Sequence, residues 1–257
     1  MKNAFALAFL LIPLFAKAQE QGKIVYNEHI DFTIELPPEM QQYAEMMPSE
    51  QSTYMDLFYN AEASFYKASP KVETAEENPF EEGDGGFQIN INMGEGAETY
   101  INRPEKLVLR AEDMMGKKFL VVGERQNMQW KILPNTREIL GYQCQEASIE
   151  MDSTVFTAWF SPQIPFSIGP GEFYGLPGAI LAVSTDNGDE KINITAEEID
   201  FANYDNEIVR PEKGKKVSQE EFEVIMRERM EEMEKMYGGD GHESEDGTIR
   251  IKVISND

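Results

Sequence analysis

The sequence has little of the residue chemistry that most enzymes use. Its 257 residues include a single cysteine, Cys144, and two histidines, His29 and His242. One cysteine cannot form a disulfide within the chain, so we expect Cys144 to be a small buried apolar side chain. The sequence also lacks the G-x-S-x-G and H-E-x-x-H motifs, which removes the usual signatures of a serine hydrolase and a zinc protease. These absences favour a protein that binds rather than catalyses.

Basic residues are also scarce. Lysine and arginine together number 23 against 47 aspartates and glutamates, which gives a formal net charge of −24. A surface this negative repels nucleic-acid phosphates and anionic lipid headgroups. We therefore expect no nucleic-acid partner, and we interpret the acidic runs as solvated loops and helix faces.

Long apolar runs are absent except at the start of the chain. Lys2 precedes an apolar stretch over residues 4–16, and Ala16-Lys17-Ala18 has the small-x-small form of a cleavage site. This pattern is typical of a secretory signal peptide over residues 1–18 and predicts export to the periplasm or the extracellular space. No later run is long enough to span a bilayer, so we expect no transmembrane segment in the mature chain.

Alternation of apolar and polar residues dominates the rest of the sequence. In residues 23–36 the apolar side chains share one parity and the polar ones share the other. Alternation of this length predicts a strand with one buried and one solvated face, as in antiparallel sheets. His29 falls on the solvated face, and Glu28 is the single exception on the apolar face.

Similar patterns recur along the chain and predict further strands. We expect them in residues 53–60, 63–69, 97–103, 106–113, 117–124, 128–133, 137–151 and 153–161. Residues 178–199 predict a hairpin that turns at Asn187-Gly188, a residue pair typical of a two-residue type I′ turn. Residues 39–50 predict a short helix, and residues 70–86 an acidic loop. Residues 218–237 predict a longer helix, in which Ser218 and Glu221 form a capping box.

These segments predict one mainly β domain of the α+β class over residues 19–237. We expect a large antiparallel sheet, curved or closed into a half-barrel, with the short N-terminal helix and the longer C-terminal helix packed on it. Residues 238–248 are acidic and rich in glycine, and we expect them to be disordered. Residues 249–257 are expected to form a C-terminal strand or tail.

Two groups of residues have some of the character of a metal site. Met230, Met233 and Met236 have a thioether spacing that suits Cu(I), but methionines at helical spacing also fill a core seam. We expect Met226, Met230 and Met233 to be core residues. Oxygen-bearing side chains gather in residues 186–190 without the spacing of a calcium loop, and the hairpin turn explains them. We therefore expect no metal site and no cofactor.

The strongest local signal is FSIGPGEFYGLPGAILAV, residues 166–183. Its glycine spacing does not match G-x-G-x-x-G, so it predicts no nucleotide loop. Pro177 and Gly178 have the residue types of a type II turn, with positive φ at the glycine. The glycines either let a loop cross closely over the sheet or admit a ligand between aromatic walls. The candidate ligand-binding residues are Trp159, Phe166, Gly169, Gly171, Phe173, Tyr174, Gly175, Leu176, Pro177 and Gly178.

The same stretch resembles the signature of the GLPGLI family, which is named for its hexapeptide. Trp130, residues 139–147 (ILGYQCQEA) and residues 158–165 (AWFSPQIP) fall in the family's order, so the resemblance covers most of the chain. Ala179 stands where the family has leucine. The resemblance implies an exported protein of Gram-negative bacteria with a shared fold and an unassigned role. By fold analogy alone, the expected sheet is similar to the half-barrels of periplasmic lipoprotein carriers.

We therefore expect an exported protein that binds an apolar or peptide ligand, or an envelope partner, near the glycine-rich stretch. One alternative is a periplasmic hydrolase that uses a pair of carboxylates which no motif identifies. The other alternative is copper binding by the methionines of the C-terminal helix.

Overall fold

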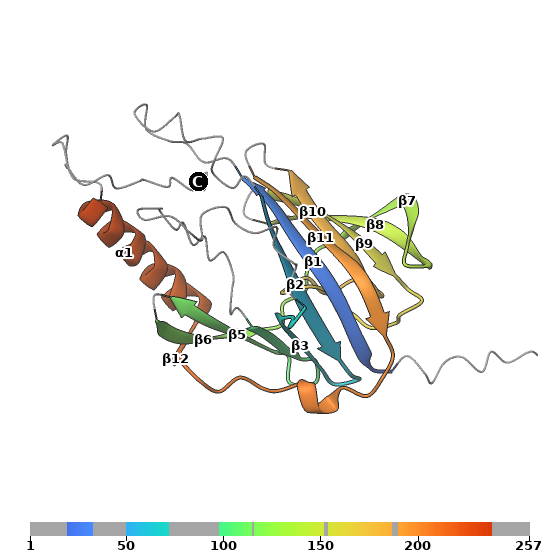
Figure 1. Ribbon diagram of the computed structural model, residues 1–257, viewed down its shortest axis with the longest axis horizontal. Coiled ribbons are helices and arrows are strands. Elements are labelled where there is room, and N and C mark those ends of the chain that lie inside the picture. Colours follow the sequence, from blue (N-terminus) through green and yellow to red (C-terminus); the bar gives the residue numbers. More distant parts are fainter. Residues whose placement is uncertain are drawn as a thin grey trace, which may run out of the picture.

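The computed structural model describes residues 20–32, 50–71, 98–114, 116–151, 154–186 and 190–237 (Figure 1). Several expectations fall outside these residues: the signal peptide, the short helix before residue 50, most of the acidic loop, the Asn187-Gly188 turn and both segments after residue 237. The side chains of Met230, Met233 and Met236 are also outside the description, so the copper hypothesis stays a prediction.

Twelve strands form one open sheet in the order β12-β6-β5-β4-β3-β2-β1-β11-β10-β9-β8-β7. The expected mainly β class is confirmed, and Figure 1 shows the sheet turning between the β12 edge and the β7 edge. The strands are β1 (Gly22–Phe32), β2 (Glu50–Tyr59), β3 (Ala63–Ala68), β4 (Glu98–Asn102), β5 (Leu107–Met114), β6 (Lys117–Glu124), β7 (Lys131–Ile139), β8 (Tyr142–Met151), β9 (Thr154–Ser161), β10 (Ala179–Asp186), β11 (Glu190–Asp200) and β12 (Lys215–Val217).

One edge of the sheet departs from the purely antiparallel arrangement that the sequence predicts. β12 pairs parallel to β6, with Lys216 opposite Leu120, whereas the other neighbours pair antiparallel. Parallel neighbours cannot be joined by a tight turn, and β6 and β12 are indeed far apart in the chain, with β7 to β11 between them. Residues 201–214, which we call the crossover, lead from the end of β11 in the interior of the sheet to β12 at the β6 edge (Figure 1).

The tight turn between β2 and β3 forms at Asn60, as expected. The Asn60 side-chain oxygen accepts hydrogen bonds from the backbone N–H groups of Glu62 and Ala63, at 2.9 and 2.8 Å. The Asn60 N–H donates to the Ala63 carbonyl at 3.0 Å. An asparagine that bonds to the following backbone groups stabilises a reverse turn locally, so this hairpin is readable from the sequence.

The segment expected as one strand over residues 137–151 is in fact divided by a turn. Leu140 and Gly141 both have positive φ, 52° and 82°, and Ile139 pairs with Tyr142 across them. Two residues of positive φ form a type I′ hairpin turn. The strand expected over 128–133 begins at Lys131 and continues to Ile139 as β7, the edge strand, where Pro134 is tolerated.

The pairing of β10 with β11 is confirmed. Val183 lies opposite Ile194, and Asp186 lies opposite Lys191. The Asn187-Gly188 turn expected between these strands lies outside the described residues and stays a prediction.

The sheet has two faces, which we call inner and outer. Residues directly opposite in neighbouring strands share a face and successive residues alternate, so Ile24 and Leu57 belong to the inner face. The inner face holds the largest apolar core cluster, which includes Ile24, Tyr26 and Leu57. Cys144 belongs to the same cluster and is buried as expected, and burial raises its pKa to about 11.

The outer face is also covered near the crossover, which the alternation in β1 does not predict. Val25 and Phe58 are buried there, and the Tyr204 ring lies 5.4 Å from the Phe58 ring between centroids. Tyr204 precedes a 3-10 turn over Asp205–Glu207 in the crossover. Ile208 packs against a second apolar cluster that includes Phe65 and Tyr100. Part of the sheet is therefore covered on both sides.

The predicted C-terminal helix is confirmed as α1 (Gln219–Tyr237). Its capping box forms: the Ser218 N–H donates to Glu221 Oε2 at 2.9 Å, and the Glu221 N–H donates to Ser218 Oγ at 3.2 Å. Phe222 packs with Phe119 and neighbouring apolar residues of β6 and β12, and Figure 1 shows α1 beside this edge. Met226 is exposed at 36%, so its expected core position is wrong.

In the part of the chain that the structure describes, no helix has the length and apolar character needed to cross a membrane.

Candidate functional site

The residues between β9 and β10 form a loop over the inner face, and we call residues 162–178 the crossing loop. Ile164, Ile168 and Leu176 of this loop are almost fully buried in the main core cluster. Two backbone hydrogen bonds hold the loop to β10, from the Ala179 N–H to the Ile164 carbonyl at 3.0 Å and from the Ile180 N–H to the Ile168 carbonyl at 2.9 Å. The crossing loop is thus an integral part of the core.

The expected type II turn at Pro177-Gly178 is wrong. The positive φ values of the loop belong to Gly171, at 54°, and Gly175, at 98°, and not to Gly178. Gly178 is instead needed for close approach, because a Cβ there would lie 2.2 Å from the Ser161 carbonyl oxygen. Gly169 is equally confined, because a Cβ would lie 2.4 Å from the Phe173 carbonyl oxygen. The glycines let the loop cross closely over the sheet, which was one of the two expectations.

Three of the predicted aromatic residues lie on the crossing loop, each against a different neighbour. The Phe166 ring lies 5.7 Å from that of Tyr59, and the Phe173 ring lies 5.2 Å from that of Phe156, measured between centroids. Tyr174 is buried in a small cluster with residues of β4 and β5. Phe166 and Phe173 are only half-buried, so they are the aromatic side chains of the loop that a ligand can reach, and the predicted Pro177 is exposed beside them in the sequence.

Trp159 lies in β9 and not on the crossing loop. It stands between Ala158 and Phe160, and strand alternation turns it away from them. The Arg137 guanidinium lies 4.4 Å from the Trp159 ring centroid. Trp159 is partly buried and packs against the same core cluster as Phe166 and Phe173, and its place in the ligand-binding set stays a prediction.

Trp130 contacts the crossing loop, although it is not among the candidate ligand-binding residues. Its indole Nε1–H donates a 2.7 Å hydrogen bond to the Tyr174 carbonyl. Its ring centroid lies 6.4 Å from that of Phe173, and a side chain at Gly175 would meet Met128 and the Trp130 ring. The signal in the sequence was only its position in the family order, because a single Trp before a strand does not indicate a partner.

Two arginines flank the crossing loop, and sequence analysis missed both. The Arg125 guanidinium lies 4.6 Å from the Tyr174 ring centroid and donates to Ser167 Oγ at 2.9 Å. The Arg103 guanidinium lies 6.0 Å from the Phe166 ring centroid and bonds backbone carbonyls of residues 60–63. Ser167 Oγ also accepts from the Gly175 N–H at 2.7 Å. Arg103 and Arg125 are thus fixed against the loop by rings and by hydrogen bonds to neutral groups.

The same arginines are electrostatically exceptional in this acidic chain. Among the described residues, neither Arg103 nor Arg125 forms an ion pair with a carboxylate. Burial, and next the charge of Arg125, lower the pKa of Arg103 to about 10. Arg103 Nη1 and Arg125 Nε are buried without a hydrogen-bond partner, and a buried donor without a partner is costly. The pair is therefore a site of uncompensated positive charge.

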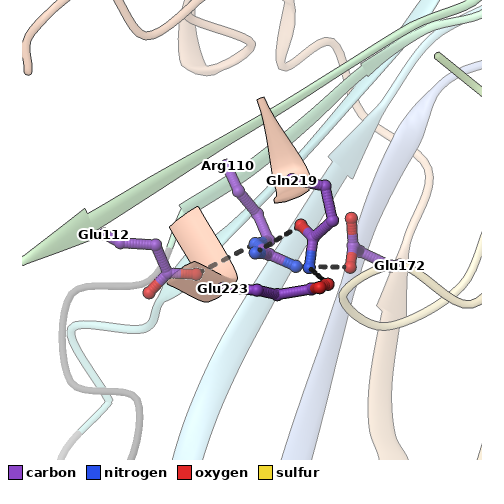
Figure 2. Close-up of polar contacts among 5 residues, drawn as sticks. All are labelled: Arg110, Glu112, Glu172, Gln219 and Glu223. Atoms are coloured by element: carbon purple, nitrogen blue, oxygen red, sulfur yellow. Dashed lines mark hydrogen bonds and ion pairs between the residues drawn. The ribbon is translucent and has the colours of Figure 1, made fainter. Parts of the chain in front are cut away.

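A third arginine, Arg110, ties the crossing loop to the sheet and to α1 (Figure 2). Its Nη1 lies 2.8 Å from Glu172 of the loop, its Nε lies 3.0 Å from Glu112, and its Nη2 donates to Gln219 at 3.0 Å. Gln219 in turn donates to Glu223 at 2.8 Å. The Arg110 Nε–H is not aligned for a hydrogen bond with Glu112, so that contact is an ion pair. The charge of Arg110 is therefore balanced by Glu112 and Glu172, unlike the charges of Arg103 and Arg125.

Glu28 is a half-buried carboxyl, and the alternation in the sequence marked it as an exception. It lies on the inner face opposite Ile194, and the Tyr66 hydroxyl donates to it at 2.5 Å. Burial raises the pKa of Glu28, against the opposing effect of the Tyr66 hydrogen bond. Burial also raises the pKa of Glu112. Four strand spacings separate β1 from β5, about 19 Å, so these two carboxyls do not form an acid–base pair.

Comparison with protein families gives one partial match. The model of a family described as a protein of unknown function, Porph_ging, matches residues 148–182. This range holds the end of β8, all of β9, the whole crossing loop and the start of β10. None of the curated proteins matches the sequence.

One solved structure shares the fold, and other solved structures match more weakly. PNGF-II in a C2 crystal form matches with a TM-score of 0.51 and 11% identity, over 80% of this chain and 33% of PNGF-II. PNGF-II in a P21 crystal form matches with a TM-score of 0.49 and 13% identity, over 80% of this chain and 33% of PNGF-II. A LolA superfamily protein from Nitrosomonas europaea matches with a TM-score of 0.32 and 8% identity, over 75% of this chain and 91% of that protein. This chain spans about a third of PNGF-II, and the two share a fold; residues 148–182 are similar to a family of unknown function.

Proposed function

We propose that this chain is an exported, non-catalytic binding protein of the GLPGLI type, whose ligand is an apolar chain that ends in one anionic group. The ligand binds at the crossing loop, with its anionic group at Arg103 and Arg125 and its apolar part on Phe166 and Phe173. The match to a family model falls on the stretch that contains this loop. A role of this kind needs no catalytic motif, in agreement with the composition of the chain.

The observation that carries the proposal is the uncompensated arginine pair. A protein with 47 acidic and 23 basic residues has ample carboxylates to neutralise two arginines. Arg103 and Arg125 nevertheless contact rings, a hydroxyl and carbonyls, and the charge of one lowers the pKa of the other. An incoming carboxylate would remove this repulsion and supply acceptors, and arginine binds carboxylates through directional hydrogen bonds.

The charge of the rest of the molecule defines the class of ligand further. A net charge of −24 repels anions at long range, so a polyanion gains little from two arginines. A ligand with a single charge and a large apolar surface avoids most of that repulsion and gains from burial on aromatic rings. A long-chain carboxylate fits both conditions.

The test compares the binding of dodecanoate and of dodecanol to the purified chain by isothermal titration calorimetry. We expect dodecanoate to bind more tightly by at least about tenfold, since one charge-assisted hydrogen bond contributes roughly 1.5–3 kcal/mol. Arg125→Gln should weaken dodecanoate binding by the same factor and leave dodecanol unchanged. Arg229→Gln removes an equal charge from α1, where Arg229 pairs with Glu232, and should change neither affinity.

Equal affinities for dodecanoate and dodecanol would overturn the role of the arginine pair. If Arg229→Gln lost as much affinity for dodecanoate as Arg125→Gln, the preference for dodecanoate would come from the net charge of the chain and not from the arginine pair. Binding of neither compound would overturn the apolar ligand and leave a peptide or an envelope partner as the occupant to test by crosslinking.

A further inference from the structure

A cluster of metal-ligating side chains lies on the outer face, on the opposite side of the sheet from the crossing loop. The pairing of β1 with β2 places His29 opposite Ser52 and Asp31 opposite Glu50. All four side chains therefore share one face of two neighbouring strands. His29, one of two histidines in the sequence, is thus surrounded by oxygen atoms from both strands.

The distances in this cluster match those between ligands of a single small cation. His29 Nε2 lies 3.1 Å from Asp31 Oδ1 and 3.6 Å from Glu50 Oε2. The three ligand atoms lie within 4.8 Å of one another. In a tetrahedral zinc site, metal–ligand distances of about 2.0–2.2 Å put neighbouring ligand atoms roughly 3.3–3.6 Å apart. A small shift of side chains at the surface would therefore bring all three atoms onto one ion.

The second ring nitrogen is arranged as it is around bound metals. His29 Nδ1 lies 2.8 Å from Ser52 Oγ. His29 Nε2 also hydrogen-bonds Asp31 Oδ1 at 3.1 Å, and because an ionised carboxylate only accepts, this bond places the proton on Nε2. A bound ion would replace that proton, and Nδ1–H would then donate to Ser52 Oγ, which orients the ring for ligation through Nε2.

The charges around the cluster also favour a divalent cation. Two carboxylates and a neutral imidazole would balance a charge of +2. Among the described residues, Asp31 and Glu50 form no ion pair with lysine or arginine. Exposed side-chain fractions of 32% for His29 and 46% for Asp31 give an ion access from solvent.

We infer that His29, Asp31 and Glu50 form a binding site for one zinc ion, with a fourth position open to water. An imidazole ligand with carboxylates suits zinc, whereas calcium and magnesium prefer oxygen ligands alone. Three protein ligands and one open position also occur in zinc sites that bind a further ligand. The sequence analysis expected no metal, because it weighed the methionines and the acidic turn and left His29 on a solvated face.

The test is titration of the EDTA-treated, dialysed full chain with zinc chloride by isothermal titration calorimetry. We expect one site, with binding that an excess of magnesium chloride does not displace. Asp31→Asn and Glu50→Gln, which keep the side-chain shape, should each weaken binding by more than about tenfold, and His29→Ala by more. Ser52→Ala should weaken it roughly tenfold or more through loss of ring orientation.

The matched control is His242→Ala, which changes the other histidine of the chain and should leave the affinity unchanged. Zinc binding that His29→Ala and Asp31→Asn leave intact would overturn the site, as would an affinity lost only in His242→Ala. Displacement of zinc by magnesium at equal concentration would show that the ion is held only by general attraction to an acidic surface. Thermal unfolding should show zinc raising the midpoint of the wild type and not that of Asp31→Asn.

Discussion

At the scale of single residues, Gly178 is required by a close contact rather than by its backbone angle. The Ser161 carbonyl occupies the space in which any Cβ would lie, at 2.2 Å from the oxygen and 2.5 Å from the carbon. These atoms belong to the backbone and cannot rotate away as a flexible side chain could. The glycine and proline pattern correctly predicted that Gly178 is a special position, but it predicted a positive φ as the reason. Turn signals describe dihedral preferences and do not report the close approach of another backbone segment.

We predict that Gly178→Ala lowers the free energy of unfolding by about 3 kcal/mol, the upper range for overpacking of a core. Urea unfolding measures it. Gly123→Ala is the control, because a Cβ there meets nothing within 4 Å, and it should change stability by less than about 0.5 kcal/mol. Equal effects of the two substitutions would contradict the contact at Ser161.

Glu28 carries a prediction about pH. Burial raises its pKa above the ordinary value of 4.5, so the folded state binds the proton more tightly than the unfolded state does. The resulting stabilisation is complete below the unfolded pKa and is lost as pH rises through the folded pKa. Glu28→Gln removes the titration and keeps an acceptor for the Tyr66 hydroxyl.

We therefore predict that the stability of Glu28→Gln relative to wild type increases between pH 4.5 and pH ~7. Chemical unfolding at a series of pH values measures this difference. A difference that stays constant with pH would show that Glu28 titrates alike in the folded and unfolded chain.

At the scale of elements, the crossing loop is only partly readable from the sequence. The stretch itself was identified, and so were Phe166, Phe173 and Tyr174. The opposite orientation of Trp159 follows from strand alternation with Ala158 and was available to sequence reasoning. Arg103 and Arg125 were not, because they lie 22 positions apart on different connections and meet only through the fold.

Helix α1 shows the same division between local and distant causes. Its start follows from Ser218 and Glu221, a pattern within one helical turn. Its attachment depends on Phe222, whose ring lies 5.6 Å from that of Phe119 in β6. The exposure of Met226 shows that helical spacing gives a candidate stripe, while the width of the partner surface decides which residues are buried.

We predict that Phe222→Ala weakens attachment of α1 by about 3 kcal/mol, in the range for removal of a large buried ring. Amide hydrogen exchange in α1 should become roughly a hundredfold faster, with little change in β1 and β11. Val224→Ala, at a side chain with 41% exposure, is the control and should leave exchange unchanged. Faster exchange across the whole sheet would contradict local attachment.

At the scale of the whole molecule, one sheet connects all the described strands. β1 and β2 lie near its middle, although they come first in the described chain, and the last strand pairs at the β6 edge. Early and late segments of the described chain are thus interleaved in one sheet, and the single domain over residues 19–237 stays a prediction.

We predict one cooperative unfolding transition. Tryptophan fluorescence reports on the β7–β9 region, where Trp130 and Trp159 lie, and far-UV circular dichroism reports on all strands. The two urea curves should coincide, as they do for a two-state domain. A fluorescence transition that precedes the loss of strand signal would show that this end of the sheet unfolds separately.

The sequence by itself determined the β class, most strand positions, the hairpin at Asn60 and the capped C-terminal helix. These features depend on alternation, turn residues and caps, which act over a few neighbouring positions. Only the tertiary structure decided the parallel β12 edge, the path of the crossing loop and the groups that meet at the arginine pair and at His29. Their causes are registers and close approaches between segments far apart in the chain, and no local pattern encodes those contacts.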